Sequence, residues 1–174
     1  MARRQIQPPG AVFRVHPPAG AANFVEIRGL HGGYGGLMPD GVVSVSLTID
    51  ERVDDVWRAI TVGRSSWWPE MVFEPIAGSA LVETWIEDGE EKRATGTITG
   101  AVAPSLLSFE WSEPGWVGPL SVSICLEPLG AATKVTLTES GFTEAQSPSG
   151  LPAEHQDGWL YHLTRLQKRP RAAR

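Results

Sequence analysis

The sequence contains almost no cysteine. Its 174 residues include one, Cys125, which excludes an internal disulfide bond and any structural zinc site built from several thiolates. Cys125 lies within an alternating strand pattern, so we expect a buried and unreactive thiol rather than a nucleophile. The sequence therefore predicts neither a metal site nor a cofactor.

Long apolar segments are also missing. No stretch approaches the roughly 20 consecutive apolar residues that cross a bilayer. The first residues include two arginines, but Pro8, Pro9 and Gly10 follow where a signal peptide would need an apolar core. We therefore expect a cytoplasmic protein that does not bind a membrane.

Positive charge is scarce over most of the chain. The net charge is −5, and residues 1–37 hold four arginines against one glutamate, which leaves −8 for the remainder. An acidic domain binds a phosphate backbone poorly. The charge distribution therefore argues against a nucleic-acid partner.

Familiar catalytic motifs are absent, since the chain contains neither GxSxG nor HExxH. His155 and His162 lie two helical turns, or about 10 Å, apart, which is too far for both to bind one metal ion. We interpret them as hydrogen-bonded or solvent-tipped histidines. Glu83, Glu87 and Glu110 fall in strand-like runs, where one that faced a pocket could act as an acid or base. Strand glutamates usually face solvent, so no catalytic residue is assigned and enzymatic activity is left open.

The first 41 residues differ in composition from the rest. They contain Pro8-Pro9-Gly10, Pro17-Pro18 and the glycine-rich run 31–36, without a sustained period of 2 or 3.6. The glycine run matches no phosphate-binding loop. We predict a flexible leader over residues 1–41, one domain over 42–168 and a basic tail over 169–174. Met38 directly precedes the ordered pattern and is a candidate translation start.

Apolar periodicity predicts the elements of this domain. Val43 to Ile49 alternate as in a half-buried strand, and Val53 to Ile60 follow the spacing of an amphipathic helix. Trp67-Trp68-Pro69 predicts a second, brief helical turn. Six strand-like runs follow, at 71–76, 80–87, 93–102, 105–112, 119–128 and 132–140, and a final helix begins near Pro152.

One strand leaves its orientation open. In the run 80–87, either Val82 and Ile86 face the core or Leu81 and Trp85 do, and the second arrangement turns Glu83 and Glu87 inward.

The order of elements predicts an α+β architecture. Consecutive strands joined by short turns favour an antiparallel meander, and a long terminal helix must bury its apolar stripe on the concave face of the sheet. We expect a helix-grip fold, in which a curved antiparallel sheet of about six or seven strands wraps the C-terminal helix. One or two short helices follow the first strand.

Several segments in this order resemble a known family. The chain is similar to the START-like SRPBCC superfamily, which includes the birch pollen allergen, and within it to the activator of heat-shock-protein ATPase-like group. The resemblance implies the helix-grip fold. It carries over no catalytic residue, because the shared motifs are packing and turn residues. These motifs are Val56-Trp57-Arg58-Ala59-Ile60, Trp67-Trp68-Pro69, Gly96-Thr97-Ile98, Leu107-Ser108-Phe109-Glu110-Trp111, Leu126-Glu127-Pro128, Thr133 through Phe142, and Gly158-Trp159.

The candidate site is aromatic. The chain holds seven tryptophans, most of them on elements that would surround one space between the sheet and the final helix. Cavities of this kind are mainly apolar, with a few polar groups. We predict that Trp67, Trp68, Phe73, Trp85, Phe109, Trp111, Trp159, His162 and Leu163 contact an apolar or aromatic small molecule.

The sequence allows three hypotheses of function. The first is a non-catalytic binder of such a molecule, with Trp116, in a Pro-Gly-Trp-Val-Gly loop, as a candidate for the mouth of the cavity. The second, implied by polyketide cyclases and hydrolases of the superfamily, is an enzyme that uses a pocket carboxylate. The third is a co-chaperone-like or stress-response module that binds a protein partner, and a homodimer is compatible with each.

Overall fold

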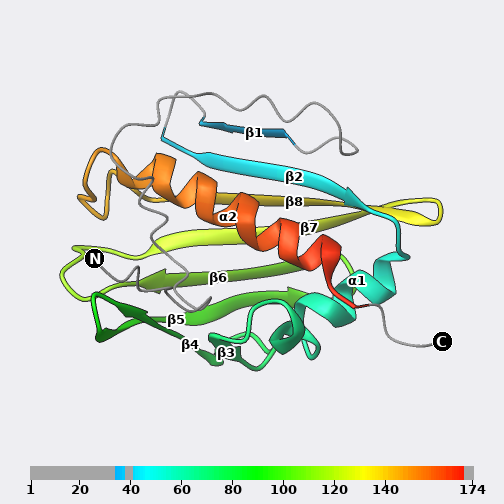
Figure 1. Cartoon of the computed structure of the whole chain (residues 1–174), viewed down its shortest axis with the longest axis horizontal. Helices are drawn as coiled ribbons and strands as arrows, with labels where there is room; N and C mark the ends of the chain where they lie inside the picture. Colours follow the sequence, from blue (N-terminus) through cyan, green and yellow to red (C-terminus); the bar gives the residue numbers. More distant parts are fainter. Residues whose placement is uncertain (1–33, 38–40, 171–174) are drawn as a thin grey trace, which may run out of the picture.

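The computed structural model describes residues 34–37 and 41–170, which form one sheet and two helices with a short 3-10 turn (Figure 1). The strands pair antiparallel in the order β1-β2-β8-β7-β6-β5-β4-β3. In chain order the elements are β1 (Tyr34–Leu37), β2 (Val43–Ile49), α1 (Val53–Ile60), η1 (Arg64–Ser66), β3 (Met71–Phe73), β4 (Ala80–Glu87), β5 (Glu90–Val102), β6 (Leu106–Ser112), β7 (Leu120–Leu129), β8 (Ala132–Ser140) and α2 (Leu151–Lys168).

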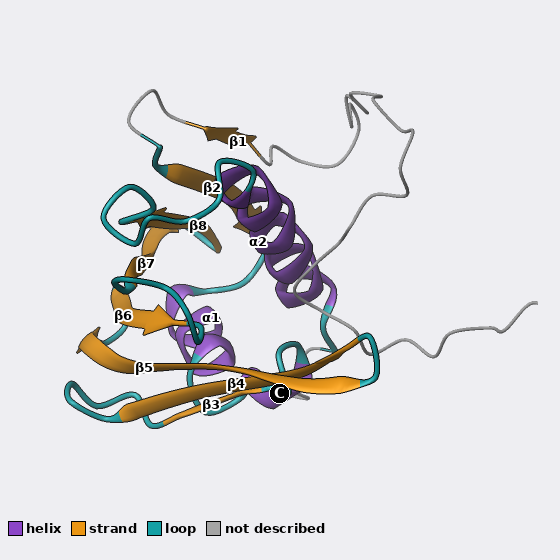
Figure 2. Ribbon diagram, turned by 90° about the vertical axis from the view of Figure 1, so that its left-hand side faces the viewer, coloured by secondary structure: helices purple, strands orange, loops and turns teal. Residues whose placement is uncertain are grey.

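The predicted helix-grip fold is confirmed. The sheet curves around the side on which α1 and α2 lie (Figure 2). The long helix α2 runs across this concave face and packs beside β2. Leu151, Trp159, Leu163 and Leu166 are buried on its inner side. None of the helices that the structure describes is long and apolar enough to cross a bilayer.

Strand alternation produces the two faces of the sheet. Along β2, Val43, Val45, Leu47 and Ile49 are buried while the residues between them are partly exposed. Because side chains of a strand point alternately to opposite faces, this pattern places one apolar row against the helices. At Gly96 of β5, a Cβ would clash with the Glu110 carbonyl of β6, so the close approach of these strands requires glycine.

The hairpin between β4 and β5 turns at Asp88-Gly89, a dipeptide typical of tight β-hairpins. Asp88 and Gly89 have positive φ angles of 52° and 82°, the left-handed conformation that both central residues of a type I′ turn require. β5 begins at Glu90, three residues earlier than predicted, and β3 is shorter than the predicted run 71–76.

The second helical turn lies earlier than expected. We predicted it at Trp67-Trp68-Pro69, but η1 spans Arg64–Ser66. Arg64 stabilises this turn, since its Nε donates to the Met71 carbonyl at 2.8 Å and its guanidinium lies 4.5 Å from the centre of the Phe73 ring. Trp67 and Trp68 follow the turn and enter the core.

Four residues of the predicted leader pair with the sheet. Tyr34–Leu37 form β1, which pairs with β2. Glycine disfavours strands, but backbone hydrogen bonds to a neighbouring strand need no side chains, which explains why the periodicity gave no signal. Met38 and the remainder of the predicted leader before Gly41 lie outside the described residues.

The expected burial of Cys125 is also wrong, because this thiol is exposed. On β7 the buried residues are Leu120, Val122, Ile124 and Leu126. Cys125 belongs to the opposite phase of the alternation and therefore points away from the core.

Candidate functional site

The nine side chains predicted to contact a ligand are all buried in one core. They come from the segment after η1, from β3, β4 and β6, and from α2, so the fold brings together positions that are far apart in the sequence. Their exposed fractions run from 0% for Trp159 and His162 to 7% for Trp85.

Six of these residues form a chain of ring contacts, which we call the aromatic cluster: Trp67, Trp68, His162, Trp159, Trp111 and Phe109. Trp68 is at its centre. Its ring centroid lies 5.6 Å from that of Trp67, 4.7 Å from His162 and 5.5 Å from Trp159. Trp159 continues the chain to Trp111 at 5.8 Å, and Trp111 to Phe109 at 6.2 Å. The indoles therefore fill much of the space between β6 and α2.

Two glutamates extend into this apolar region, and the first is Glu139 of β8. It is fully buried. Its Oε1 accepts a hydrogen bond from Trp111 Nε1 at 2.9 Å, and its Oε2 accepts one from Trp159 Nε1 at 2.6 Å. His155 Nδ1 lies 2.9 Å from the same Oε2. Both oxygens are thus engaged, and Glu139 fixes the positions of two indoles.

Sequence reasoning missed Glu139, although a signal was present. Thr133, Val135, Leu137 and Glu139 occupy alternate positions of β8, and all four are buried. The phase of the alternation therefore places Glu139 in the interior with Val135 and Leu137. His155, interpreted as hydrogen-bonded, does find a partner in this carboxylate.

The second glutamate, Glu83 of β4, is bonded at one oxygen only. Leu81, Glu83 and Trp85 are buried, which decides the open orientation of this strand and turns Glu83 inward. Glu83 Oε1 accepts a hydrogen bond from Trp68 Nε1 at 2.9 Å. Its Oε2 is buried and has no hydrogen-bond partner among the described residues.

Burial makes Glu83 a neutral acid at pH 7. It raises the pKa of the carboxyl group to about 8, against the opposing effect of the Trp68 hydrogen bond, and the charges of Glu70 and Glu113 raise it further. A protonated carboxyl group can donate a hydrogen bond as well as accept one. Glu110, in contrast, is exposed on β6 and Glu87 is partly exposed, so Glu83 is the predicted carboxylate that reaches the interior.

Trp85 also has a polar atom without a hydrogen-bond partner among the described residues. Its indole is 7% exposed, and its Nε1 is buried without a hydrogen-bond partner among the described residues. It stands two positions after Glu83 on the same face of β4, about 7 Å along the strand.

His162 is uncharged in this environment. Burial, helped by the positive charge of Arg165, lowers its pKa to about 3. Its ring also lies 6.4 Å from Trp67 and 6.3 Å from Trp159, centre to centre. In the described part of the chain, no group of three or more His, Cys, Asp or Glu residues could hold a metal ion.

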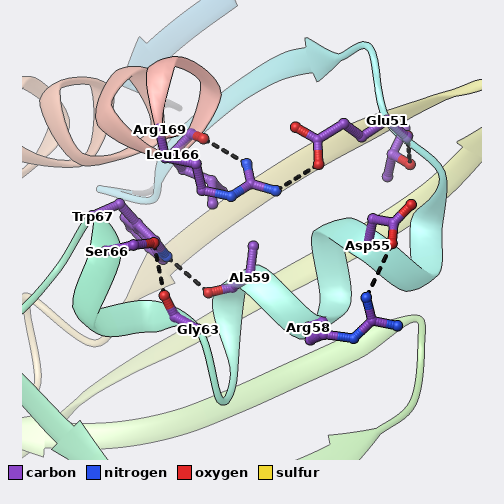
Figure 3. Close-up of polar contacts among 10 residues, drawn as sticks. Glu51, Asp55, Arg58, Ala59, Gly63, Ser66, Trp67, Leu166 and Arg169 are labelled. Carbon is purple, nitrogen blue, oxygen red and sulfur yellow. Dashed lines mark hydrogen bonds and ion pairs between the residues drawn. The ribbon is translucent and has the colours of Figure 1, made fainter. Parts of the chain in front are cut away.

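A pocket of about 670 Å³ opens beside α1, between this helix, η1 and the C-terminal end of α2 (Figure 3). An ion pair crosses it, with Arg169 Nη2 2.7 Å from Glu51 Oε2, while Arg169 Nη1 donates to the Leu166 carbonyl. Arg169, the first residue of the predicted tail, thus contacts the domain. The pocket is lined by Asp50, Glu51, Asp55, Arg58, Ala59, Gly63, Ser65, Ser66, Arg169 and Pro170.

Trp67 connects this pocket with the aromatic cluster. Its Nε1 donates to the carbonyl of Ala59 at 2.9 Å (Figure 3), and Ala59 lines the pocket. The other side of Trp67 contacts Trp68 and His162. None of the nine predicted residues lines the pocket itself.

Residues 50–169 match the sequence model of the family described as Activator of Hsp90 ATPase homolog 1-like protein. The match covers more than half of the 174 residues. The chain belongs to this family. The resemblance found in its sequence motifs is thereby confirmed, and the helix-grip domain described above is a member of the Activator of Hsp90 ATPase homolog 1-like group.

Solved structures share this family member's fold. DynU16, described as a putative protein in the dynemicin biosynthetic locus, is 24% identical with a TM-score of 0.62, over 75% of this chain and 47% of its own. This chain therefore spans about half the length of DynU16. CalU16 from Micromonospora echinospora is 22% identical with a TM-score of 0.56, over 79% and 82% of the two chains. Protein MLL2253 from Mesorhizobium loti is 21% identical with a TM-score of 0.59, over 73% and 94%. No curated protein matches the chain.

Proposed function

We propose that this protein binds an apolar or aromatic small molecule in the interior between the sheet and α2, as a cytoplasmic binding protein without catalysis. The observation that carries the proposal is the buried Glu83 Oε2, which has no hydrogen-bond partner among the described residues. Leaving a buried polar atom unpaired costs on the order of 1–3 kcal/mol. A group of this kind in an aromatic interior is typical of a ligand site, where the bound molecule supplies the missing partner.

The pocket beside α1 would be the mouth of this site. Its volume of about 670 Å³ is in the range of small-molecule pockets, but most of the residues that line it are polar or charged. The apolar surface that would hold the ligand begins behind Trp67. A ligand would therefore pass from the pocket into the aromatic cluster as this indole rotates away from Ala59.

Calorimetric titration and thermal melting of the full chain, with a panel of fatty acids, naphthalenes and polycyclic aromatic ketones, test the proposal. A ligand present at 100 times its Kd stabilises the protein by about 2.7 kcal/mol, so binding should raise the melting temperature. Glu83→Gln should change the affinity, whereas Glu110→Gln, on the exposed side of β6, should leave it unaltered. A panel that gives neither heat nor a thermal shift would remove this function.

A second candidate function is a cyclase- or hydrolase-like reaction with Glu83 as acid or base. The specific observation in its favour is the pKa of about 8, which suits proton transfer near neutral pH. Product analysis by mass spectrometry after incubation with the ligands that bind would separate the candidates. Turnover that disappears in Glu83→Gln without loss of binding would identify an enzyme, and unchanged ligand would identify a binder.

A further inference from the structure

The face of β4 that looks into the interior carries two polar atoms that lack a hydrogen-bond partner in the described part of the chain. Glu83 Oε2 and Trp85 Nε1 are both buried, and neither has a hydrogen-bond partner among the described residues. They are two positions apart on one face of the strand, so they border the same part of the interior. An indole N–H can only donate, and it therefore requires an acceptor that the described protein atoms do not provide.

The other buried tryptophans show that an indole N–H without an acceptor is not a general property of this core. Trp111, Trp159 and Trp68 all donate their indole N–H to a glutamate, and Trp67 donates to a carbonyl. Trp85 is the buried tryptophan in the described residues whose N–H has no acceptor. Among the buried indoles of the described residues, the missing acceptor is thus specific to Trp85, beside Glu83 on β4.

We propose that the interior beside β4 binds an uncharged aromatic molecule through an acceptor oxygen of the carbonyl type, which receives hydrogen bonds from the Glu83 carboxyl group and the Trp85 indole. This inference rests on the proposed function and adds the chemical class of the ligand. A carbonyl oxygen has two lone pairs and can accept from both donors. The rings of the aromatic cluster would pack against the apolar part of the molecule.

The charges around Glu83 favour an uncharged ligand. Glu70, which precedes β3, and Glu113, which follows β6, act on the carboxyl group, and they would repel an anion. His162, which contacts Trp68 from α2, is neutral and offers no positive charge. A cation would need an ionised Glu83, and placing such a pair in the interior costs several kcal/mol per ion before the attraction is counted. It would also leave the Trp85 N–H without an acceptor.

Three probes with one carbon skeleton test the inference by calorimetry on the full chain at pH 6: 2-acetylnaphthalene, 2-ethylnaphthalene and 1-(2-naphthyl)ethylamine. They present a carbonyl group, no polar group and an ammonium group at the same position. We expect the ketone to bind about tenfold more tightly than the hydrocarbon, the amount that hydrogen bonds to buried donors supply. The amine should bind more weakly than the ketone.

One variant and one change of pH connect this preference with β4. Trp85→Phe removes the N–H while it keeps an aromatic ring, and it should lower the affinity for the ketone several-fold but not that for the hydrocarbon. At pH 9 the wild-type preference should shrink, because Glu83 then loses the proton that it donates. Glu110→Gln is the matched control and should retain the full preference.

The outcomes separate the inference from the function on which it rests. Equal affinities for ketone and hydrocarbon, or tightest binding of the amine, would overturn the ligand class and leave an interior binding site intact. Absence of binding by all three probes would overturn both. Because the three-probe comparison uses the wild-type chain, it decides the matter even if a variant fails to fold.

Discussion

Two glutamates of the same core are in opposite situations. Glu139 has hydrogen-bond partners at both oxygens, supplied by β6 and α2. Glu83 has one partner, supplied by Trp68. Buried polar groups are almost always hydrogen-bonded in proteins, so we assign Glu139 to the architecture of the core and Glu83 to a ligand.

The titration of Glu83 should appear in the pH dependence of stability. Its pKa is raised to about 8 in the folded protein from a normal value of 4.5. Between these values the folded state holds a proton that the unfolded state lacks. The free energy of unfolding should therefore fall as pH rises from 4.5 to about 8, with a slope of at most ~1.4 kcal/mol per pH unit.

His162 contributes in the opposite direction, because its pKa is lowered to about 3. Its neutral form is favoured in the folded state, so stability rises with pH from about 3 to 6.5, and the two effects oppose each other between 4.5 and 6.5. Urea unfolding of wild type and Glu83→Gln from pH 4 to 9 isolates the glutamate. From pH 4 to 9, the free energy of unfolding of the wild type should fall by a few kcal/mol relative to that of Glu83→Gln. A difference between the two proteins that stays constant with pH would show that Glu83 titrates normally.

At the scale of elements, the proposed route of ligand entry passes the connection between η1 and β3. Trp67 stands between the charged pocket and the aromatic cluster, and a single hydrogen bond from Nε1 joins it to the Ala59 carbonyl of α1. Trp116, the candidate for the mouth in the sequence, is partly buried near His155, with 6.0 Å between the ring centres. The proposed entrance beside α1 and the loop that carries Trp116 are therefore two alternatives that a rate measurement can separate.

Truncation of Trp67 should speed up ligand entry. Trp67→Ala removes the indole between pocket and cluster, so the association rate of 2-acetylnaphthalene in stopped-flow fluorescence should increase at least several-fold. The change should also destabilise the fold by about 3–5 kcal/mol, because a buried indole is lost. Trp116→Ala provides the comparison. If it accelerates association while Trp67→Ala does not, the entrance lies at the loop before β7.

At the scale of the whole molecule, periodicity in the sequence accounts for most of the fold. The alternation in β2, β6, β7 and β8 and the stripes of α1 and α2 could be predicted, because each follows from one buried face. β1 could not, since its glycines pack no side chains and its pairing depends on β2. The contact of Arg169 with the domain could not be predicted either. Its partner Glu51 is far away in the sequence, and no periodicity connects the two residues.

The candidate site was predictable in its aromatic part and not in its polar part. The tryptophans could be assigned because large apolar side chains gather in any core that the strands enclose. The orientation of Glu83 depended on the register of β4, for which the sequence allowed two solutions. Which oxygen of Glu83 stays unpaired depends on the position of Trp68, and that position is a product of the tertiary fold.

The state of the Glu83 carboxyl group tests the account most directly. ¹³C NMR of the side-chain carboxyl, assigned with Glu83→Gln, reports both its protonation and its hydrogen bonding. At pH 7 we predict the resonance of a neutral acid that titrates near pH 8 and shifts saturably when 2-acetylnaphthalene is added. A carboxylate that titrates near pH 4.5 and does not respond to the ketone would contradict the proposed site.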